Sequence, residues 1–436
     1  MTETLYNLYK ECTGICTDTR KITEGVMFFA LKGDNFDGND FALKALEMGA
    51  RYAVVDRPSL QGVTHNRTHK CILVENVLQA LQELAAYHRS LFDIPVLGIT
   101  GTNGKTTTKE LIAAALGRKY NVLYTQGNFN NGIGVPLTLL GISPRHQFAV
   151  IEMGASAPGE IKELVRLVKP TCGVVTNVGK AHLLGFGSFE GVMRTKGELY
   201  DYLRQVGGPV FYNSDNPYLC RMVSTRPGLV ARPYGVTGQN ASVEKTSADN
   251  PFLSIRLADG STVSTKLIGR YNADNVLCAL FVAGFFDVPE KMAITAIQDY
   301  TPSNNRSQFL RTDRNGVIVD AYNANPTSMD AAISSFREID FPDKAIILGD
   351  MLELGESSDE EHRKVLQNAF EITPTILTVG ENFAAATAEL NLTEQVMNFP
   401  TADILKEYLE HSPLEGKTIL VKGSNGTHLQ SIVESL

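Results

Sequence analysis

The stretch Val96-Leu-Gly-Ile-Thr-Gly-Thr-Asn-Gly-Lys-Thr-Thr107 decides how the rest of the sequence is interpreted. A continuous apolar run, typical of a parallel strand buried on both faces, leads into a glycine-rich turn. Gly101 and Gly104 let the backbone curl so that several N–H groups converge on one phosphate. Lys105 and Thr106 then begin a helix whose positive end favours an anion. The first glycine of the strict Walker pattern would fall at Ile99, so the sequence departs from that pattern at one position. The strand–loop–helix context nevertheless predicts a loop that binds nucleotide phosphate, with the Thr106 hydroxyl as a ligand of Mg²⁺.

Short apolar strands alternate with helical patterns on both sides of this loop. Strands are expected at Val96–Thr100, Phe148–Glu152, Gly173–Thr176 and Pro209–Tyr212, and helices at Lys105–Leu116 and Gly159–Val168. Such alternation is typical of a doubly wound α/β sheet. Residues 237–268 differ, because apolar and polar residues alternate there and predict antiparallel ribbons.

The pattern changes twice along the 436 residues, which predicts three α/β domains. An N-terminal α/β domain, residues 1–92, mixes short strands near 28–31 and 53–55 with a helix over Val77–Leu91. A central P-loop ATPase-like domain spans 93–303. A Rossmann-like domain, 304–436, restarts the alternation, with strands at 317–320, 344–348, 376–379 and 418–421 and helices near 328–337, 359–371, 402–411 and 427–435.

Composition and charge exclude several classes of protein. Apolar residues make up 43% and charged residues 20%, an ordinary globular balance. A net charge of −8 argues against nucleic-acid binding. The chain has no run of 18 apolar residues and a polar N-terminus, so neither a transmembrane helix nor a signal peptide is indicated. Its six scattered cysteines are expected to be reduced thiols, and the protein is expected to be cytoplasmic.

Polar residues that follow two other strands are candidate metal ligands. Glu152 ends one strand, and Thr176 leads into Asn177-Val-Gly-Lys-Ala-His182. Open α/β sheets bind ligands beyond the carboxyl ends of their strands, where a carboxylate and an imidazole can share Mg²⁺ with a phosphate. A lone Glu or His is more often an ordinary surface or core residue, and Lys196 by itself would be a solvated helix lysine.

Four motifs, in this order, resemble the Mur ligase family of peptidoglycan synthesis. They are Thr100–Thr107, Glu152-Met-Gly-Ala155, Thr176-Asn-Val-Gly-Lys-Ala-His-Leu183 and Lys196-Gly-Glu198. Thr17-Asp-Thr-Arg20 and Phe28–Phe41 look like the uridine-nucleotide-binding domain of the D-alanyl-D-alanine-adding members. Asn128–Leu139 and Leu348–Gly355 look like the same members, so the resemblance covers nearly the whole chain.

The resemblance implies an ATP-dependent carbon–nitrogen ligase that works in cell-wall precursor synthesis. ATP would phosphorylate the carboxylate at the end of UDP-N-acetylmuramoyl-tripeptide. The amine of D-alanyl-D-alanine would then attack the acyl phosphate, and ADP and phosphate would be released. The third domain would carry the dipeptide site and close over ATP. Nothing suggests an obligate oligomer, so we expect a monomer, and the third residue of the tripeptide, lysine or diaminopimelate, stays open.

The resemblance also implies roles for individual residues, of which Lys105, Glu152, His182 and Lys196 would be catalytic. ATP would be held by Gly101, Thr102, Asn103, Gly104, Lys105, Thr106 and Thr107, with Asn272 and Asn275 by the adenine and Arg306 and Asp320 reaching phosphate and ribose. Mg²⁺ would be bound by Thr106 and Glu152, and a second ion by His182 and a carbamate on Lys196. The nucleotide-sugar substrate would contact Thr19, Arg20, Lys32, Asn130 and Asn131.

The sequence departs from the family pattern at three places. Ser156-Ala157 stands where Asn-His commonly follows Glu-Met-Gly-Ala, and Tyr271 stands where the family has His in Gly-Arg-His-Asn. Asn425 stands where Arg often follows Ser. No substrate role is assigned to these positions.

Three alternatives remain at this point. The chain could be another amide ligase, either a different Mur member or a folylpolyglutamate synthase, although the uridine-type N-terminal block argues against the folate enzyme. It could be a P-loop protein that uses ATP for regulation or nucleic-acid movement, although the sequence shows no basic stripe. A degenerate ligase is the third alternative, but Lys105, Thr106, Glu152, His182 and Lys196 are all present.

Overall fold

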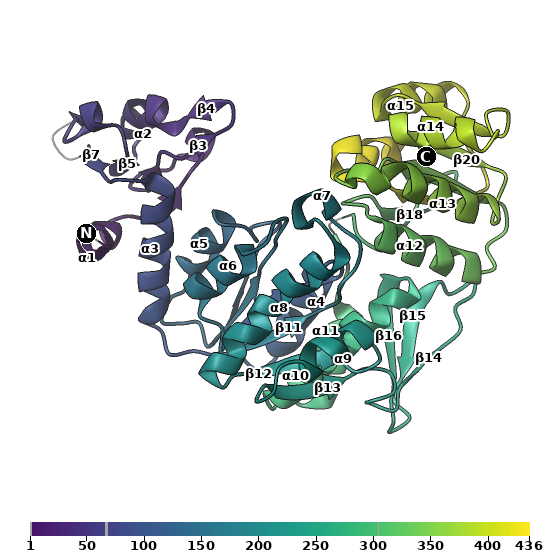
Figure 1. The fold of residues 1–436 in the computed structure, drawn as a ribbon, viewed down its shortest axis with the longest axis horizontal. Coiled ribbons are helices and arrows are strands. Elements are labelled where there is room, and N and C mark those ends of the chain that lie inside the picture. Colours follow the sequence, from purple (N-terminus) through teal and green to yellow (C-terminus); the bar gives the residue numbers. More distant parts are fainter. Residues whose placement is uncertain (1, 66–68, 304) are drawn as a thin grey trace. The chain divides into compact units, whose positions relative to one another are not determined.

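The computed structural model describes residues 2–65, 69–303 and 305–436 (Figure 1). The chain divides into two compact units. The first comprises Met1–Gly98, Tyr120–Gly154 and Ile161–Thr171, and the second comprises Ile99–Lys119, Ala155–Glu160 and Cys172–Leu436. Asn304, at the expected boundary between the second and third domains, lies outside the described residues, so the three-domain division stays a prediction.

The first unit contains a small, mostly parallel sheet with the order β1-β2-β5-β7-β6. Its strands are β1 (Ile15–Cys16), β2 (Met27–Phe29), β5 (Tyr52–Val55), β6 (Thr64–His65) and β7 (His69–Leu73). All neighbours pair in parallel except β6 and β7. Strand β2 begins and ends earlier than the expected 28–31. A core that includes Phe28, Leu46 and Ala53 packs α2 (Ala42–Glu47) onto this sheet.

Helix α3 (Val77–Ser90) confirms the helix expected at the end of the N-terminal block. Asn76 caps it by accepting a hydrogen bond from the Gln79 N–H, and Val77, Leu81 and Leu84 are buried along one side. The other elements of the first unit are α1 (Thr2–Tyr9), β3 (Lys32–Gly33), β4 (Phe36–Asp37), β9 (Val122–Tyr124), α5 (Gly134–Leu139), β10 (Phe148–Glu152) and most of α6 (Glu160–Val168).

A six-stranded sheet, with the order β13-β12-β11-β8-β10-β9, contains the strand that leads into the phosphate loop. Its further strands are β8 (Val96–Thr100), β11 (Cys172–Val175), β12 (Pro209–Asn213) and β13 (Val230–Tyr234). The pairs β9–β10, β11–β12 and β12–β13 are parallel. Since β8 lies between β10 and β11, its carboxyl end is where the strand order reverses, the place where such sheets bind ligands. The doubly wound sheet is thereby confirmed.

The helices that accompany this sheet in the second unit follow the expected alternation. They are α4 (Lys105–Leu116), α7 (Leu183–Phe186), α8 (Phe189–Val206), α9 (Pro217–Ser224), α10 (Ala273–Phe285) and α11 (Glu290–Asp299). The expected ribbons are confirmed as the antiparallel sheet of β14 (Ser242–Val243), β15 (Phe252–Arg256) and β16 (Thr262–Ile268). Inward-facing Leu253, Ile255 and Val263 are buried, which accounts for the alternating pattern.

The C-terminal part of the second unit is a second doubly wound sheet, with the order β17-β18-β22-β19-β20-β21. Its strands are β17 (Gln308–Arg311), β18 (Gly316–Asp320), β19 (Lys344–Gly349), β20 (Ile376–Val379), β21 (Val396–Phe399) and β22 (Thr418–Lys422). Only β17 pairs antiparallel, with β18. Its helices are α12 (Pro326–Glu338), α13 (Ser358–Phe370), α14 (Glu381–Glu389) and α15 (Ala402–His411).

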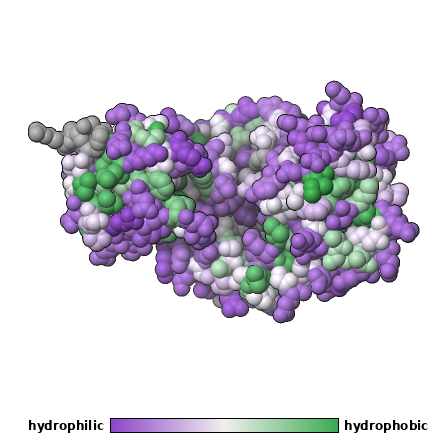
Figure 2. Space-filling model, turned by 90° about the horizontal axis from the view of Figure 1, so that it is seen from above, coloured by the Kyte–Doolittle hydropathy of each residue, from purple (hydrophilic) through white to green (hydrophobic). Residues whose placement is uncertain are grey.

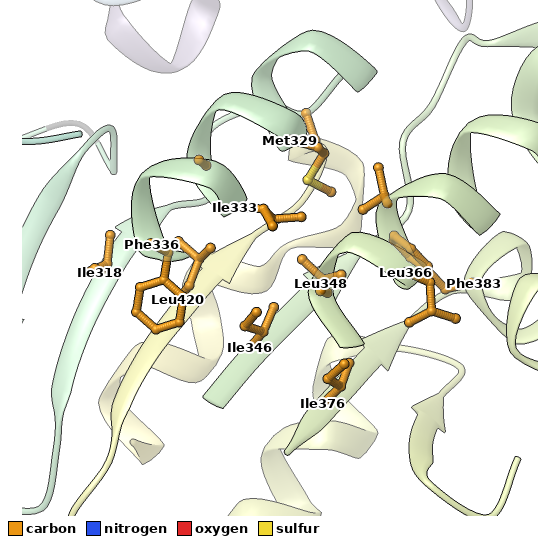
Figure 3. Packing of buried hydrophobic residues seen from close by; sticks show 14 of the residues in the cluster. Ile318, Met329, Ile333, Phe336, Ile346, Leu348, Leu366, Ile376, Phe383 and Leu420 are labelled. Atoms are coloured by element: carbon orange, nitrogen blue, oxygen red, sulfur yellow. The ribbon is translucent and has the colours of Figure 1, made fainter. Parts of the chain in front are cut away.

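Two hydrophobic cores cover the two faces of this sheet. On one face, Ile346 and Leu420 from the strands meet Phe336 of α12 and Leu366 of α13 (Figure 3). On the other face, alternate residues of the same strands, such as Ile347, pack with residues of α15 and of the C-terminal segment. Burial on both faces explains why these strands are continuous apolar runs.

The helix expected near 427–435 is present as a 3-10 helix and not as an α-helix. The chain forms two 3-10 helices there, Asn425–Thr427 and Leu429–Ser435, separated by His428 with a φ of +53°. Leu429 and Ile432 are buried at a spacing of three residues, which fits the three-residue turn of a 3-10 helix as well as an α-helix. The left-handed backbone at His428 prevents a continuous α-helix through this segment.

No helix among the described residues is long and apolar enough to cross a membrane. The face in Figure 2 is largely hydrophilic, with small separate groups of hydrophobic residues. All six cysteines are free thiols.

Acid should destabilise the first unit through His88, which is 6% exposed on α3. Its Nε2–H donates to the Ile142 carbonyl at 2.8 Å, and its Nδ1 accepts from the Tyr6 hydroxyl at 3.2 Å, so the ring is satisfied while neutral. Burial lowers the pKa of His88. As the pH falls, the unfolded chain therefore binds a proton at this histidine before the folded chain does. The contribution of His88 to the free energy of unfolding is complete above about pH 6.5 and is lost as the pH falls toward the pKa of His88 in the folded protein.

We expect urea unfolding, followed by circular dichroism, to show a smaller free energy of unfolding at pH 5 than at pH 7.5. His88→Gln, whose amide can make both hydrogen bonds without titrating, should have a shallower pH dependence. Some dependence should remain, because burial also lowers the pKa values of His146 and His362. An unchanged slope in His88→Gln would contradict the prediction.

Candidate functional site

The loop between β8 and α4 has the geometry of a phosphate cradle. Gly101 has a φ of +147° and Gly104 a φ of +76°, backbone conformations that side chains with a Cβ rarely adopt. Gly104 is the N-cap of α4 and makes no side-chain cap hydrogen bond, which leaves the helix start to a ligand. Lys105 Nζ donates to the carbonyls of Gly101 at 2.8 Å and Thr102 at 3.0 Å, so its ammonium lies over the loop. Thr106, 3% exposed, lies in the first turn.

The segment after β11 braces this loop. The Thr102 N–H donates to the Asn177 carbonyl at 3.0 Å, and the Asn103 N–H donates to Asn177 Oδ1 at 2.9 Å. Thr176 Oγ1 donates to the Asn103 carbonyl at 2.6 Å. The sequence alone indicates no role for Thr176 or Asn177. Their position at the carboxyl end of the strand beside β8 was the signal that could have identified them.

Gly101→Ala should weaken nucleotide binding. A Cβ at Gly101 would lie 2.0 Å from Thr176 Oγ1, and the φ of the residue is itself unfavourable for alanine. Strain of roughly 1–3 kcal/mol predicts a loss of about 5- to 150-fold in ADP affinity by titration calorimetry. Gly284→Ala is the matched control, because nothing lies within 4 Å of a Cβ at that position in α10. Equal ADP affinity in a folded Gly101→Ala protein would refute this explanation of the loop.

A chain of buried polar side chains leads away from α4. Thr108 Oγ1 donates to Asn275 Oδ1 at 2.9 Å, and Asn275 Nδ2 donates to Asn272 Oδ1 at 2.8 Å. Asn272 Nδ2 donates to Ser307 Oγ at 3.0 Å, and the Ser307 N–H donates to Asp320 Oδ1 at 3.3 Å. The structure thus connects Asn272, Asn275 and Asp320, three expected ATP contacts, through a serine that sequence analysis missed.

This polar chain explains the departure at Tyr271 and places two further residues. The Tyr271 hydroxyl hydrogen-bonds Ser307 Oγ at 3.0 Å. The Arg306 guanidinium lies 3.7 Å from the centroid of the Tyr322 ring, and its buried Nε has no hydrogen-bond partner among the residues that the structure describes. Lys422 Nζ, almost fully buried, pairs with Asp320 Oδ2 at 2.6 Å. Arg306 thus directly precedes Ser307, whose N–H donates to Asp320, and its guanidinium lies on the ring of Tyr322, two residues after Asp320.

Lys196 and His182 both lie against Phe186 at the end of α7. The Lys196 ammonium is 5.3 Å from the centroid of the Phe186 ring, and the His182 ring packs edge-on to it with centroids 6.3 Å apart. Ser188 caps α8 and so positions Lys196, whose Nζ donates to the Ala155 carbonyl at 3.2 Å. Lys196 is 2% exposed, not solvated. Burial, reinforced by the Lys105 ammonium, lowers the pKa of Lys196 to about 7.

Residues of the C-terminal sheet region contact the loops around this site. Asn103 and Asn325 exchange hydrogen bonds through their side-chain amides, at 2.8 and 3.3 Å. The Lys180 N–H donates to Thr327 Oγ1 at 3.0 Å, and Lys180 Nζ pairs with Glu361 Oε1 at 2.5 Å. His182 Nδ1 hydrogen-bonds the carboxylate of Glu353. These contacts join residues more than 140 positions apart, which no local pattern could have indicated.

Glu152, Asn130 and Asn131 lie in the first unit. Glu152, 1% exposed at the end of β10, accepts a hydrogen bond from Asn130 Nδ2 at 2.9 Å. Asn131 Oδ1 accepts from the N–H groups of Ile133 and Gly134 and orders the start of α5. Glu152 thus adjoins one of the expected substrate residues, and its approach to Thr106 stays a prediction.

The other expected substrate residues lie at the carboxyl-end loops of the small N-terminal sheet. Thr19 and Arg20 form a 3-10 turn capped by Asp18. The Arg20 guanidinium forms two hydrogen bonds to Asp18, at 2.9 and 2.8 Å, which lower the pKa of Asp18 to about 2. Lys32 pairs with Asp56 at 3.1 Å. Both cations are well exposed, so they are available to an anionic ligand.

The side chains at this site suit Mg²⁺ only if a nucleotide adds phosphate oxygens and a modified lysine adds a carboxylate. Among residues 2–65, 69–303 and 305–436, no three His, Cys, Asp or Glu side chains cluster as a metal site. Thr106, His182 and Lys196 offer a hydroxyl, an imidazole and an amine. Mg²⁺ prefers oxygen ligands and is commonly held by one or two protein groups plus phosphates. The residues therefore fit the ion if Lys196 carries a carboxylated nitrogen.

Comparison with known proteins agrees with this geometry. Family models match three segments: "Mur ligase family, catalytic domain" over residues 11–89, "Mur ligase middle domain" over 99–283, and "Mur ligase, glutamate ligase domain" over 305–425. The chain is 34% identical to UDP-N-acetylmuramoyl-tripeptide–D-alanyl-D-alanine ligase of Bacillus subtilis, with 97% of this chain and 93% of the relative covered. It is 33% identical to the Escherichia coli protein of the same name, with the same coverage.

Solved structures show the same relationship. A crystal structure of MurF from Acinetobacter baumannii superposes with a TM-score of 0.84 and 28% identity, covering 99% of this chain and 97% of the other. MurF ligase from Thermotoga maritima in complex with ADP superposes with a TM-score of 0.82 and 26% identity, covering 97% and 96%.

Proposed function

Because this chain belongs to the Mur ligase family, we propose that it is an ATP-dependent ligase that adds D-alanyl-D-alanine to UDP-N-acetylmuramoyl-tripeptide. The named relatives, similar over nearly their whole length, support the substrate pair, and the ADP complex of the Thermotoga maritima relative supports the use of ATP. The reaction forms an amide through an acyl phosphate and releases ADP and phosphate.

The observation that carries the proposal is the buried Lys196 beside the phosphate loop. Lys196 is 2% exposed, and it is close enough to Lys105 for the Lys105 ammonium to lower the pKa of Lys196. ATP hydrolysis by an ordinary P-loop ATPase does not require such a second lysine. A neutral amine can take up CO₂ and become a carbamate, an oxygen ligand for Mg²⁺. Magnesium, when bound, offsets the repulsion between a triphosphate and the carboxylate brought up to it.

The chain's own residues then divide the work. Lys105 and the N–H groups from Gly101 to Thr107 would hold the β/γ-phosphates, and Thr106 with Glu152 would bind one Mg²⁺. His182 and the Lys196 carbamate would bind the second. Asn272 and Asn275 would lie by the adenine, and Arg306 and Asp320 would reach phosphate and ribose. Holding the acyl phosphate beside the attacking amine can lower the barrier by roughly 7–11 kcal/mol through proximity.

The remaining parts of the proposal concern partners and surroundings. Thr19, Arg20, Lys32, Asn130 and Asn131 would contact the nucleotide-sugar end of the substrate, in a domain of residues 1–92. Residues 304–436 would carry the dipeptide site and close over ATP held by residues 93–303. The six free thiols favour the reducing cytoplasm. We propose a monomer with no nucleic-acid partner.

The test is phosphate release from ATP and Mg²⁺ with UDP-N-acetylmuramoyl-tripeptide, with and without D-alanyl-D-alanine. We expect release only with both substrates and a product heavier by the dipeptide. Lysine- and diaminopimelate-containing tripeptides would identify the third residue by their kcat/KM values. No release with either tripeptide, but release with a single amino acid or a folate acceptor, would overturn the substrate assignment in favour of another amide ligase.

A further inference from the structure

The Glu353 carboxylate meets the imidazole of His182, 171 positions earlier in the chain. Glu353 lies in the loop after β19, and His182 directly precedes α7. The pairing is more than a side-chain encounter, because the Leu184 N–H also donates to the Glu353 carbonyl at 3.4 Å. Nothing in the proposed function uses Glu353.

The hydrogen bond determines which nitrogen of His182 is available to a ligand. An ionised carboxylate only accepts, so Nδ1 must carry the proton that it donates to Glu353. The neutral ring then has its lone pair on Nε2. A histidine that binds a metal commonly donates its other N–H to a carboxylate or carbonyl, which orients the ring and makes it a better ligand.

The backbone on both sides of the contact is in an unusual conformation. His182 has a φ of +49° and Glu353 a φ of +63°, and neither is a glycine. Left-handed conformations of this kind cost free energy and persist where the surrounding contacts hold them. The neighbouring contacts of Lys180 with Thr327 and Glu361 help to hold them, since they join the loop before α7 to α12 and α13 of the C-terminal sheet.

We propose that Glu353 is a positioning residue that holds His182 in the Nδ1–H tautomer, with Nε2 directed to the second Mg²⁺. The inference rests on the proposed function, in which His182 is a ligand of that ion. Glu353 belongs to the region of the C-terminal sheet, strands β17 to β22, whereas His182 belongs to residues 93–303, which would bind ATP. The imidazole of His182 is therefore oriented for the metal only while these two regions are in contact. Docking of the region that carries the C-terminal sheet is thereby coupled to metal binding.

The first test measures the tautomer without metal or substrate. In the full-length protein labelled with ¹⁵N-histidine, a long-range ¹H–¹⁵N spectrum at pH 8 should show His182 protonated at Nδ1, with His182→Asn assigning the signal. In Glu353→Ala the signal should shift toward the Nε2–H tautomer. Glu353→Gln should keep the wild-type tautomer, because its amide oxygen can still accept. Glu356→Gln, an exposed glutamate in the same loop, is the matched control.

The second test measures metal affinity. Mn²⁺ titration followed by electron paramagnetic resonance, with a non-hydrolysable ATP analogue, should show two ions per wild-type chain. Glu353→Ala should weaken the second by roughly tenfold or more, while the first and the Glu356→Gln control stay unchanged. An unaltered His182 tautomer, or an unaltered second Mn²⁺ affinity, in Glu353→Ala would overturn the proposal.

These readouts separate this inference from the proposed function. If no tripeptide supports phosphate release while both readouts respond to Glu353, the substrate assignment falls and the Glu353–His182 pair stands. If the ligase is active and neither readout responds, the contact is only structural.

Discussion

Lys105→Met is expected to lower kcat/KM for ATP by about 10²–10³-fold, the usual effect of removing one donor that stabilises transition-state charge. Methionine keeps the length and volume of the stem but removes the ammonium that lies over the Gly101 and Thr102 carbonyls. Two consequences combine: the phosphates lose a cation, and the loop loses two hydrogen bonds. Steady-state kinetics and ADP titration should both record the loss.

Lys119→Met is the matched control for that substitution. Lys119 Nζ also donates to two backbone carbonyls, those of Phe286 at 3.2 Å and Asp287 at 3.0 Å, but beyond the other end of α4. It should leave kcat/KM for ATP unchanged. Equal effects of the two substitutions would mean that Lys105 serves the fold and not the nucleotide.

Lys196→Ala should lower kcat by a comparable factor, about 10²–10³-fold, and millimolar formate or acetate should restore part of it. An unperturbed lysine has a pKa near 10.4, so keeping it neutral at pH 7.4 costs about 4 kcal/mol. With its pKa lowered to about 7 by burial, Lys196 is already substantially neutral at that pH, so burial in the folded protein supplies most of this free energy. Arg194→Ala, exposed on the same helix, is the control.

The pH dependence follows from the same lowered pKa. Only the neutral amine adds CO₂, so wild-type activity should fall as pH drops below about 7, when the ammonium form returns. Activity of Lys196→Ala with formate should not show this fall. Carbon-13 NMR after equilibration with ¹³CO₂ should show one carbamate signal in the wild type and none in Lys196→Arg. A fully active Lys196→Ala enzyme would refute the carbamate.

Elements with a simple physical signature were predictable from the sequence. Strand β8 and helix α4 were found at their observed bounds because an apolar run, two glycines and a helix stop at Gly117 mark their ends. For the segment 427–435 the sequence predicts a helix but not its kind, because a three-residue apolar spacing fits both an α-helix and a 3-10 helix. For the site, family motifs indicated His182 and Lys196, but neither periodicity nor spacing could show that Lys196 is buried.

The contacts that the sequence could not show are those between distant segments. Ser307 looks like an ordinary linker residue, yet it joins Asn272 to Asp320. Glu353 lies in a segment that helped to indicate the family, but its pairing with His182 depends on how two sheets are placed. Such pairs depend on tertiary packing. The periodicity and spacing of residues in one sequence indicate local structure and not which distant residues meet.

The reciprocal amide pair of Asn103 and Asn325 has a consequence for the chemical ageing of the protein. Asn103 precedes Gly104, the neighbour that least hinders loss of ammonia from an asparagine side chain. An aspartate formed there could only accept hydrogen bonds, so it would lose the bond donated to Asn325. It would also bring a negative charge into a loop shaped for phosphate. Loss of the Asn103 amide on prolonged storage should therefore inactivate the protein, and it should be slowest while the hydrogen bonds with Asn325 hold that amide in place.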